Sequence, residues 1–162
     1  MKLYIIRHGL AGQHGDYAND DERPLTLEGK RKTEQIAKRI WQLGLKFDLI
    51  LTSPLTRAKQ TAEILKAAHL SDALEVEGYL APGGDVQTWV AWFEAWRTPE
   101  KTLALVGHEP DLSGWAELLI WGEIRDRIIL KKAGAIGLEV PDTGSIIANS
   151  QLFWLTPPKF LL

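Results

Sequence analysis

The amino-acid sequence predicts an α/β protein, a three-layer sandwich in which helices cover both faces of a mostly parallel, mixed sheet. Short apolar runs rich in Leu, Ile and Val alternate with longer stretches of helical periodicity, which is the pattern of buried parallel strands joined by helices. The last two apolar runs are separated by the turn Pro141-Asp142-Thr143-Gly144, which predicts a final antiparallel hairpin. With 162 residues the chain can bury a sizeable core, and we expect one domain over residues 1–162.

The expected elements begin with a strand over residues 3–6, which ends in the polar tripeptide Arg7-His8-Gly9. A polar loop over residues 10–22 leads to the first helix. Further strands are expected over residues 48–52, 74–77, 102–106, 135–140 and 146–155, and helices over residues 27–43, 54–69, 86–96 and 112–121. Caps for these helices are expected at Thr26, Ser53, Asp85 and Asp111, with Pro54 at a first helical position and Gly44 at a C-terminal stop.

Composition and charge exclude several classes of protein. Lys plus Arg is 19 and Asp plus Glu is 21, a net charge of −2, which gives no support to nucleic-acid binding. The absence of cysteine excludes disulfides, cysteine-ligated zinc and thiol nucleophiles. No apolar stretch is long enough to span a membrane, and Arg7 interrupts the first apolar run too early for a signal peptide. We expect a cytoplasmic protein that contacts neither nucleic acid nor membrane.

Polar side chains suited to an oxyanion follow three of the expected strands. Arg7 and His8 follow the first strand, Arg57 lies in the helix after the second, and His108 follows the strand over residues 102–106. In open α/β sheets ligands bind beyond the carboxyl ends of the strands, so we expect these side chains to meet there. Arginine binds phosphate oxygens bidentately, so the convergence predicts a phosphate site.

A mechanism follows from these residue types. Neutral His8 can attack phosphorus and form a phosphohistidine that water then hydrolyses. Arg7 and Arg57 would neutralise the phosphoryl oxygens, and His108 would donate a further hydrogen bond. Gly9 would allow the backbone to approach the ligand closely. Because these groups supply the positive charge, and the sequence has no Walker-type glycine loop and no H-x-x-x-H pair, we expect no metal and no cofactor.

Three motifs carry a family resemblance, and they stand in order along the chain: Leu3-Tyr4-Ile5-Ile6-Arg7-His8-Gly9, Ser53-Pro54-Leu55-Thr56-Arg57-Ala58-Lys59-Gln60-Thr61-Ala62 and Val106-Gly107-His108. Together they resemble the histidine phosphatase superfamily, also called the phosphoglycerate mutase-like or RHG family. The resemblance implies a phosphoglycerate mutase-like fold, with His8 as the phosphorylated nucleophile. It also implies that Arg7, Arg57 and His108 form the phosphate pocket.

Two further segments, Arg23-Pro24-Leu25-Thr26 and Leu80-Ala81-Pro82-Gly83-Gly84-Asp85, resemble the compact SixA-type phosphohistidine phosphatases. This resemblance implies a phosphorylated protein substrate, such as a histidine-containing phosphotransfer domain. Arg23 is interpreted either as a third phosphate-binding arginine or as one partner of a loop ion pair. Larger relatives place an acidic general acid after the second arginine motif, where only Glu77 is available here. Glu109 is a second weak candidate.

The leaving group bears on the missing acid. A phosphate ester leaves as an alkoxide and benefits from a positioned acid, whereas phosphohistidine leaves as imidazole and can take its proton from solvent. A missing acid therefore favours a P–N substrate. Two alternatives stay open: a phosphatase or mutase for sugar phosphates or nucleotides, and a phosphoprotein-binding module without turnover.

The basic residues of the first expected helix are interpreted as a solvated face, and steering of an acidic protein partner is the weaker alternative. They are Lys30, Arg31, Lys32, Lys38 and Arg39. We expect the protein to be a monomer.

Overall fold

A six-stranded mixed sheet forms the centre of the structure, with the strand order β3-β2-β4-β1-β5-β6. The computed structural model describes residues 1–162. The strands are β1 (Lys2–Arg7), β2 (Leu49–Thr52), β3 (Leu74–Val76), β4 (Thr102–Gly107), β5 (Ala135–Glu139) and β6 (Gln151–Thr156). The strands from β3 to β1 in this order run parallel, whereas β5 pairs antiparallel with β1 and β6 with β5. The prediction of an α/β protein with a mostly parallel, mixed sheet is confirmed.

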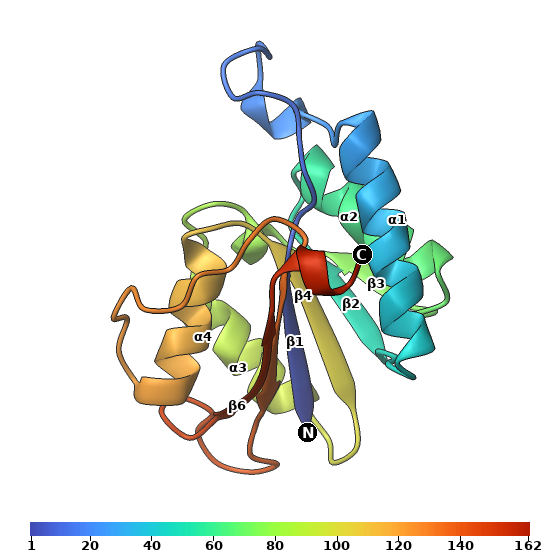
Figure 1. Ribbon diagram of the computed structural model, residues 1–162. Helices are drawn as coiled ribbons and strands as arrows, with labels where there is room; N and C mark the ends of the chain where they lie inside the picture. The colour runs from blue at the N-terminus through green and yellow to red at the C-terminus, as the bar shows by residue number, and fades with distance from the viewer.

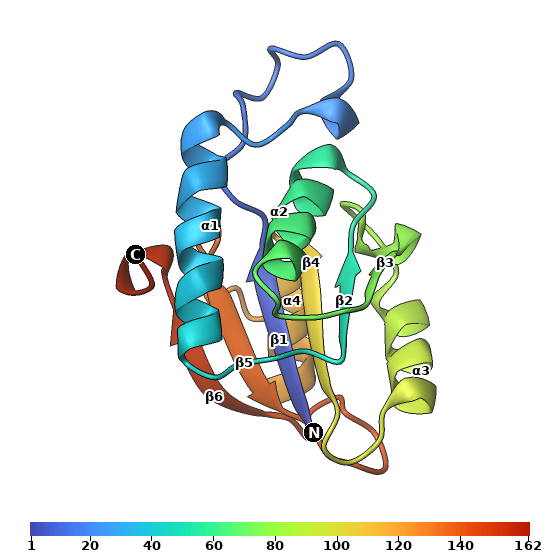
Figure 2. The same cartoon turned by 90° about the vertical axis from the view of Figure 1, so that its right-hand side faces the viewer.

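Helices cover both faces of the sheet, as Figures 1 and 2 show. They are α1 (Leu27–Gln42), α2 (Thr56–Ala67), α3 (Val86–Trp96) and α4 (Asp111–Trp121), with the short 3₁₀ turns η1 (Asp20–Glu22), η2 (Gly78–Leu80) and η3 (Pro158–Phe160). Helices α1 and α2 pack on one face, and α3 and α4 on the other. None of these helices has the length and apolarity needed to cross a membrane.

The central strand β1 shows why the sheet strands are apolar without alternation. Leu3 and Ile5 belong to the core under α3 and α4, whereas Tyr4 and Ile6 belong to the core under α1 and α2. Successive side chains of a strand point to opposite faces, so a sheet covered on both faces needs apolar residues at every position. The sandwich therefore follows directly from the pattern of the sequence.

Two of the expected helix caps are confirmed. The Thr26 hydroxyl accepts the backbone N–H of Gly29 at 2.9 Å, and the Asp85 carboxylate accepts that of Gln87 at 3.0 Å. Each side chain satisfies an N–H group that has no partner within its helix.

Two other expected caps are wrong. Helix α2 begins at Thr56 rather than after Ser53, and the Ser53 hydroxyl bonds both to the backbone N–H of Leu55 and to His108. Helix α4 begins at Asp111 itself, with Pro110 in the capping position. The Asp111 carboxylate instead accepts the backbone N–H of Gly83 at 2.7 Å, which ties α4 to the loop before α3.

The last strand is shorter than expected, since β6 begins at Gln151 rather than at Ile146. The preceding segment bonds to the end of α4 instead of to the sheet. The backbone N–H of Ala148 donates to the carbonyl of Leu118, and that of Ser150 donates to Leu119. The expected antiparallel pairing with β5 is nevertheless present.

Candidate active site

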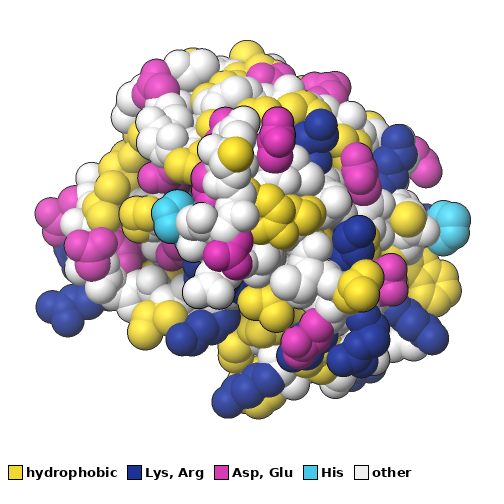
Figure 3. Space-filling view, turned by 90° about the horizontal axis from the view of Figure 1, so that it is seen from above, with side chains coloured by type: hydrophobic (Ala, Val, Ile, Leu, Met, Phe, Trp, Pro, Cys, Tyr) yellow, Lys and Arg dark blue, Asp and Glu magenta, His cyan; other side chains and the backbone are white.

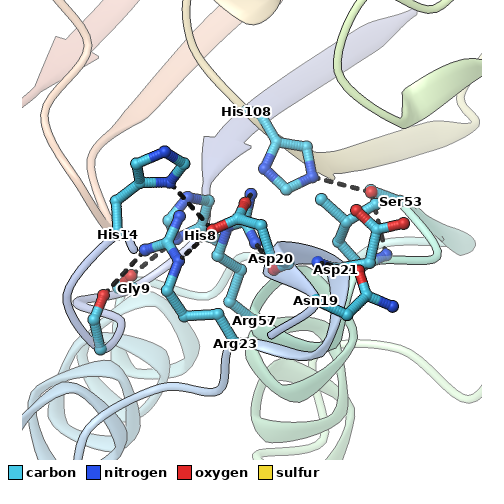
Figure 4. A network of polar contacts seen from close by, with 12 residues as sticks. His8, Gly9, His14, Asn19, Asp20, Asp21, Arg23, Ser53, Arg57 and His108 are labelled. Atoms are coloured by element: carbon cyan, nitrogen blue, oxygen red, sulfur yellow. Dashed lines mark hydrogen bonds and ion pairs between the residues drawn. The ribbon is translucent and has the colours of Figure 1, made fainter. Parts of the chain in front are cut away.

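The strand order places the predicted site residues together at the carboxyl edge of the parallel strands. Because β1 pairs with β4 in parallel register, with Arg7 opposite Gly107, His8 and His108 leave the sheet side by side. Their ring centroids are 5.2 Å apart, and both side chains are buried. The loop from β1 to α1 rises beyond this edge (Figure 1), and Figure 4 shows Asp20 of this loop in contact with Arg57 and Arg23.

His8 is held as a neutral imidazole with one nitrogen free. Its Nδ1 lies 2.7 Å from the carbonyl oxygen of Gly9, and a carbonyl can only accept, so Nδ1 carries the proton. The pKa of His8 is lowered to about 3, mainly by burial, against the effect of the Gly9 carbonyl and with smaller contributions from His108, Arg57 and Arg7. At neutral pH the Nε2 lone pair is therefore available for attack.

His108 is oriented by a serine that follows the neighbouring strand. Its Nε2 lies 2.7 Å from the hydroxyl of Ser53, and its buried Nδ1 has no partner. The Ser53 hydroxyl also accepts the backbone N–H of Leu55 at 3.2 Å, and we assign its own proton to the bond with Nε2. The ring then carries its proton on Nδ1. Burial, followed by the charge of Arg57, lowers the pKa of His108 to about 4.

Two arginines present further buried donors. Nη1 of Arg7 donates to the carbonyl of Leu130 at 3.0 Å, and Nη1 of Arg57 donates to the carbonyl of Asp20 at 2.9 Å. The Nε atoms of both arginines are buried without a partner, as is Nδ1 of His108. Buried polar groups are nearly always hydrogen-bonded, so these three donors mark a place for an acceptor. The acceptor that suits two guanidinium groups is an oxyanion.

Arg23 forms the loop ion pair that was one of its two expected roles. Its Nε lies 2.8 Å from the Asp20 carboxylate, and its Nη1 donates to the carbonyl of Gly12 at 2.8 Å. The charge of Arg23 also lowers the pKa of both Arg57 and His108, so it acts on the same site. Binding of phosphate by Arg23 stays a prediction.

Gly9 packs closely beneath α1, and approach of a ligand to its backbone stays a prediction. Its backbone N–H donates to the hydroxyl of Thr61 at 3.0 Å and is therefore already paired. A Cβ at this position would collide with the Thr33 hydroxyl of α1 and would lie 3.3 Å from Leu25. Glycine allows the end of β1 to pass closely under α1.

Neither candidate general acid bonds to the site histidines or arginines, although the charge of Glu109 acts on Arg7 against burial, which lowers the pKa of Arg7. The Glu109 carboxylate accepts the backbone N–H of Ser113 at 2.9 Å and its hydroxyl at 2.6 Å, so it is occupied at the start of α4. The Glu77 carboxylate forms no hydrogen bond or ion pair; only its backbone is bonded, with the N–H donating to the carbonyl of Thr52 and the carbonyl accepting the N–H of Leu80. No cluster of three or more His, Asp or Glu side chains has the arrangement of a metal site.

Sequence reasoning missed Asp20, which covers the arginines of the site. Its carboxylate lies 2.8 Å from Nε of Arg23, 3.3 Å from Nη2 of Arg57 and 3.0 Å from Nδ1 of His14 (Figure 4). The hydrogen bond from Arg23 is the main cause that lowers the pKa of Asp20 to about 2. The spacing of three residues between Asp20 and Arg23 was the available signal.

Sequence reasoning also missed Lys132, which lies two residues after Leu130 in the loop before β5. This side chain is half-buried, and its pKa is lowered by burial and then by the charges of Arg7, Arg23 and Arg57. It therefore lies in the electric field of all three arginines. No local pattern marks it, because its position depends on the path of a long loop.

Comparison with known proteins gives a consistent result. The sequence profile of the Histidine phosphatase superfamily (branch 1) matches residues 3–79. An uncharacterized protein of Picosynechococcus sp. is 49% identical over 165 residues, which cover 100% of this chain and 99% of that protein. Phosphohistidine phosphatase SixA of Escherichia coli is 37% identical over 98 residues, which span 59% of this chain and 58% of SixA. A structure of the protein histidine phosphatase SixA complexed with tungstate has a TM-score of 0.86 and 27% identity, with 100% of both chains covered.

Proposed function

Because the chain belongs to the histidine phosphatase superfamily, we propose that it is a phosphatase that transfers the phosphoryl group of its substrate to His8. The observation that carries this proposal is the pairing of a neutral His8, with a free Nε2, and three buried donors without partners. A nucleophile and preorganised donors for the phosphoryl oxygens are the two requirements of phosphoryl transfer.

The reaction proceeds in two displacements. Nε2 of His8 attacks phosphorus, a P–N bond forms, and the bond from phosphorus to the leaving group breaks. Arg7, Arg57 and Nδ1 of His108 stabilise the charge on the equatorial oxygens, and the positive charge of Arg23 adds to the field. Water then attacks the phosphohistidine, which releases inorganic phosphate and restores His8. No step needs a metal ion, so turnover in the presence of EDTA should equal turnover in its absence.

The preferred substrate is a phosphohistidine side chain of a protein, such as a histidine-containing phosphotransfer domain. No carboxylate is bonded to His8 or His108, and Asp20, which pairs with Arg23 and Arg57, has a pKa of about 2 and is a poor proton donor. This supports the choice, because an imidazole leaving group can take its proton from solvent. Similarity to SixA, whose name states this activity, supports it further. The alternative substrate is a phosphate ester of a sugar or nucleotide.

A substrate panel tests this choice. The rate of hydrolysis of a phosphorylated phosphotransfer domain is compared with the rates for sugar phosphates, nucleotides and phosphoserine. We expect kcat/KM to be highest for the phosphohistidine protein. A clear preference for any ester would refute the P–N substrate and leave the phosphatase mechanism standing.

The covalent step is tested by brief exposure to labelled substrate, followed by acid and base treatment. Wild-type protein should carry an acid-labile, base-stable phosphate, and His8→Ala should carry none and lose turnover by at least about a thousandfold. His69→Ala, at an exposed position, is the control. A wild-type protein without label and without turnover on any substrate would indicate a phosphoprotein-binding module instead.

A further inference from the structure

A basic hollow lies beside the phosphate site, and Arg7 belongs to both. It has a volume of about 610 Å³ and is formed by the loop before β5 and the segment that includes η3. Its lining residues are Arg7, Lys131, Lys132, Pro157, Pro158 and Lys159. We call this hollow the lysine groove.

No ion pair compensates the charge of the lysine groove, although the Glu109 carboxylate acts on Arg7. None of its lining residues is acidic, and none of its four cations takes part in any of the six ion pairs of the structure. Lys131 and Lys159 are exposed, and the Lys159 ammonium lies 4.9 Å from the ring centre of Phe160. Four positive charges without an ion-pair partner produce a local field that attracts anions.

The placement of Lys132 indicates a role in binding. A half-buried ammonium near three guanidinium groups, with no carboxylate partner, does not stabilise the fold. The backbone nevertheless holds it there. The N–H of Ala133 donates to the carbonyls of both Arg7 and His8, at 3.0 and 3.1 Å, and Arg7 donates to the carbonyl of Leu130. The lysines are thereby fixed to the end of β1 that carries the nucleophile.

The lysine groove continues away from the phosphate site. A second hollow of about 290 Å³ shares Lys132, Pro158 and Lys159 with it and extends to Lys32 on α1. Lysine and arginine side chains gather along the lower edge of the face that Figure 3 shows, which looks onto the carboxyl ends of the strands. Two joined hollows are longer than one small anion requires, and they suit an extended acidic surface.

We propose that the lysine groove binds acidic side chains of the phosphorylated protein while its phosphoryl group lies against His8. This inference rests on the proposed function, because it names the surface that surrounds the phosphohistidine of the substrate. The phosphoryl group and a neighbouring carboxylate would share Arg7 between them. The groove thus selects among phosphoproteins by the charge around the phosphorylated residue.

The test uses the double variant Lys131→Gln/Lys159→Gln, since both side chains are exposed and their loss leaves the core intact. For a phosphorylated phosphotransfer domain we expect KM to rise about tenfold, with kcat within about twofold of wild type. For phosphoramidate, which has no second anionic group, kcat/KM should stay within about twofold of wild type. Lys46→Gln/Lys66→Gln, at exposed positions elsewhere, is the matched control and should behave as wild type. An unchanged KM for the phosphoprotein would refute the proposal.

A binding measurement keeps the groove testable independently of turnover. Titration with a hexaglutamate peptide and with pyrophosphate compares wild type with the double variant. Peptide binding that weakens about tenfold in the variant supports the proposal even if no phosphohistidine substrate is hydrolysed. Binding of pyrophosphate but not of the peptide would assign the groove to a small molecule with two anionic groups and overturn the proposal.

Discussion

The hydroxyl of Ser53 lies 2.7 Å from Nε2 of His108 and links the ends of two neighbouring strands, β2 and β4. This contact decides which nitrogen of His108 carries the proton. With the serine donating to Nε2, the proton lies on Nδ1, the buried nitrogen that has no partner of its own. Ser53, at the end of β2, thus keeps Nδ1 of His108, at the end of β4, protonated as a hydrogen-bond donor.

Removal of this hydroxyl should lower turnover. In Ser53→Ala the ring can take either tautomer, so we expect kcat to fall about tenfold and the pH dependence of kcat to change, with a smaller effect on KM. Ser150→Ala is the control, because its buried hydroxyl donates to the carbonyl of Ile146 far from the site. A fall in kcat of equal size in Ser150→Ala would show that the effect is general destabilisation.

The Asp20 carboxylate should oppose the binding of phosphate. It lies 3.3 Å from Nη2 of Arg57 and 2.8 Å from Nε of Arg23, so its negative charge repels an approaching dianion. We expect Asp20→Asn to lower the inhibition constant of inorganic phosphate about tenfold. Asp16→Asn, an exposed position in the same loop, should leave the constant unchanged. Weaker inhibition in Asp20→Asn would mean that the carboxylate mainly positions the arginines.

The two site histidines should make stability depend on pH. Their pKa values in the folded protein, about 3 and about 4, lie below the ordinary value near 6.5 in the unfolded chain. The unfolded chain therefore takes up protons first as the pH falls below about 6.5, and stability is lost. Between pH 7 and pH 5 each histidine should lower the free energy of unfolding by up to about 2 kcal/mol. Urea unfolding of wild type and His108→Gln at several pH values measures this. An equal dependence of the free energy of unfolding on pH in both proteins would contradict it. His69→Asn is the control.

Glu117 should stabilise the loop that leads to the lysine groove. Its buried carboxylate accepts four consecutive backbone N–H groups, from Arg125 to Ile128, at 2.5–2.8 Å. Burial alone would raise the pKa of Glu117, but these bonds hold it below its ordinary value. The amide in Glu117→Gln presents donors to donors, so the free energy of unfolding should fall by about 2–3 kcal/mol. Glu123→Gln, which is exposed, should change it by less than about 0.5 kcal/mol. Equal stability of the two variants would contradict this role.

The close packing of Gly9 under α1 should be visible in a double-mutant cycle. Gly9→Ala pushes a methyl group into the Thr33 hydroxyl, and we expect a loss of about 1–3 kcal/mol in the free energy of unfolding. Thr33→Ala removes that hydroxyl, so the double variant should be more stable than the sum of the single effects predicts. Additive losses in urea unfolding would show that the clash is relieved elsewhere.

The sheet and the placement of His8, Arg57 and His108 could be predicted because each depends on a local pattern. A polar residue after an apolar run marks a strand end, and parallel strand ends share one edge. The role of Ser53 could not be predicted this way. Ser-Pro is a local signal for a helix start, but the partner of this hydroxyl lies 55 residues away, on a strand whose place beside β2 the sequence pattern does not reveal. The roles of Asp20 and Lys132 could not be predicted for the same reason, since long loops bring these residues to the site.

The position of β1 between β4 and β5 has a consequence for synthesis of the protein. Strand β1 pairs with residues 102–107 and 135–139, so both of its neighbours are made long after it. Contacts between such distant segments form slowly, and a nascent chain keeps this apolar strand unpaired until they arrive. His8 therefore acquires its surroundings only after residues 102–107 and 135–139 have been made, and shorter nascent chains carry the nucleophile without the site.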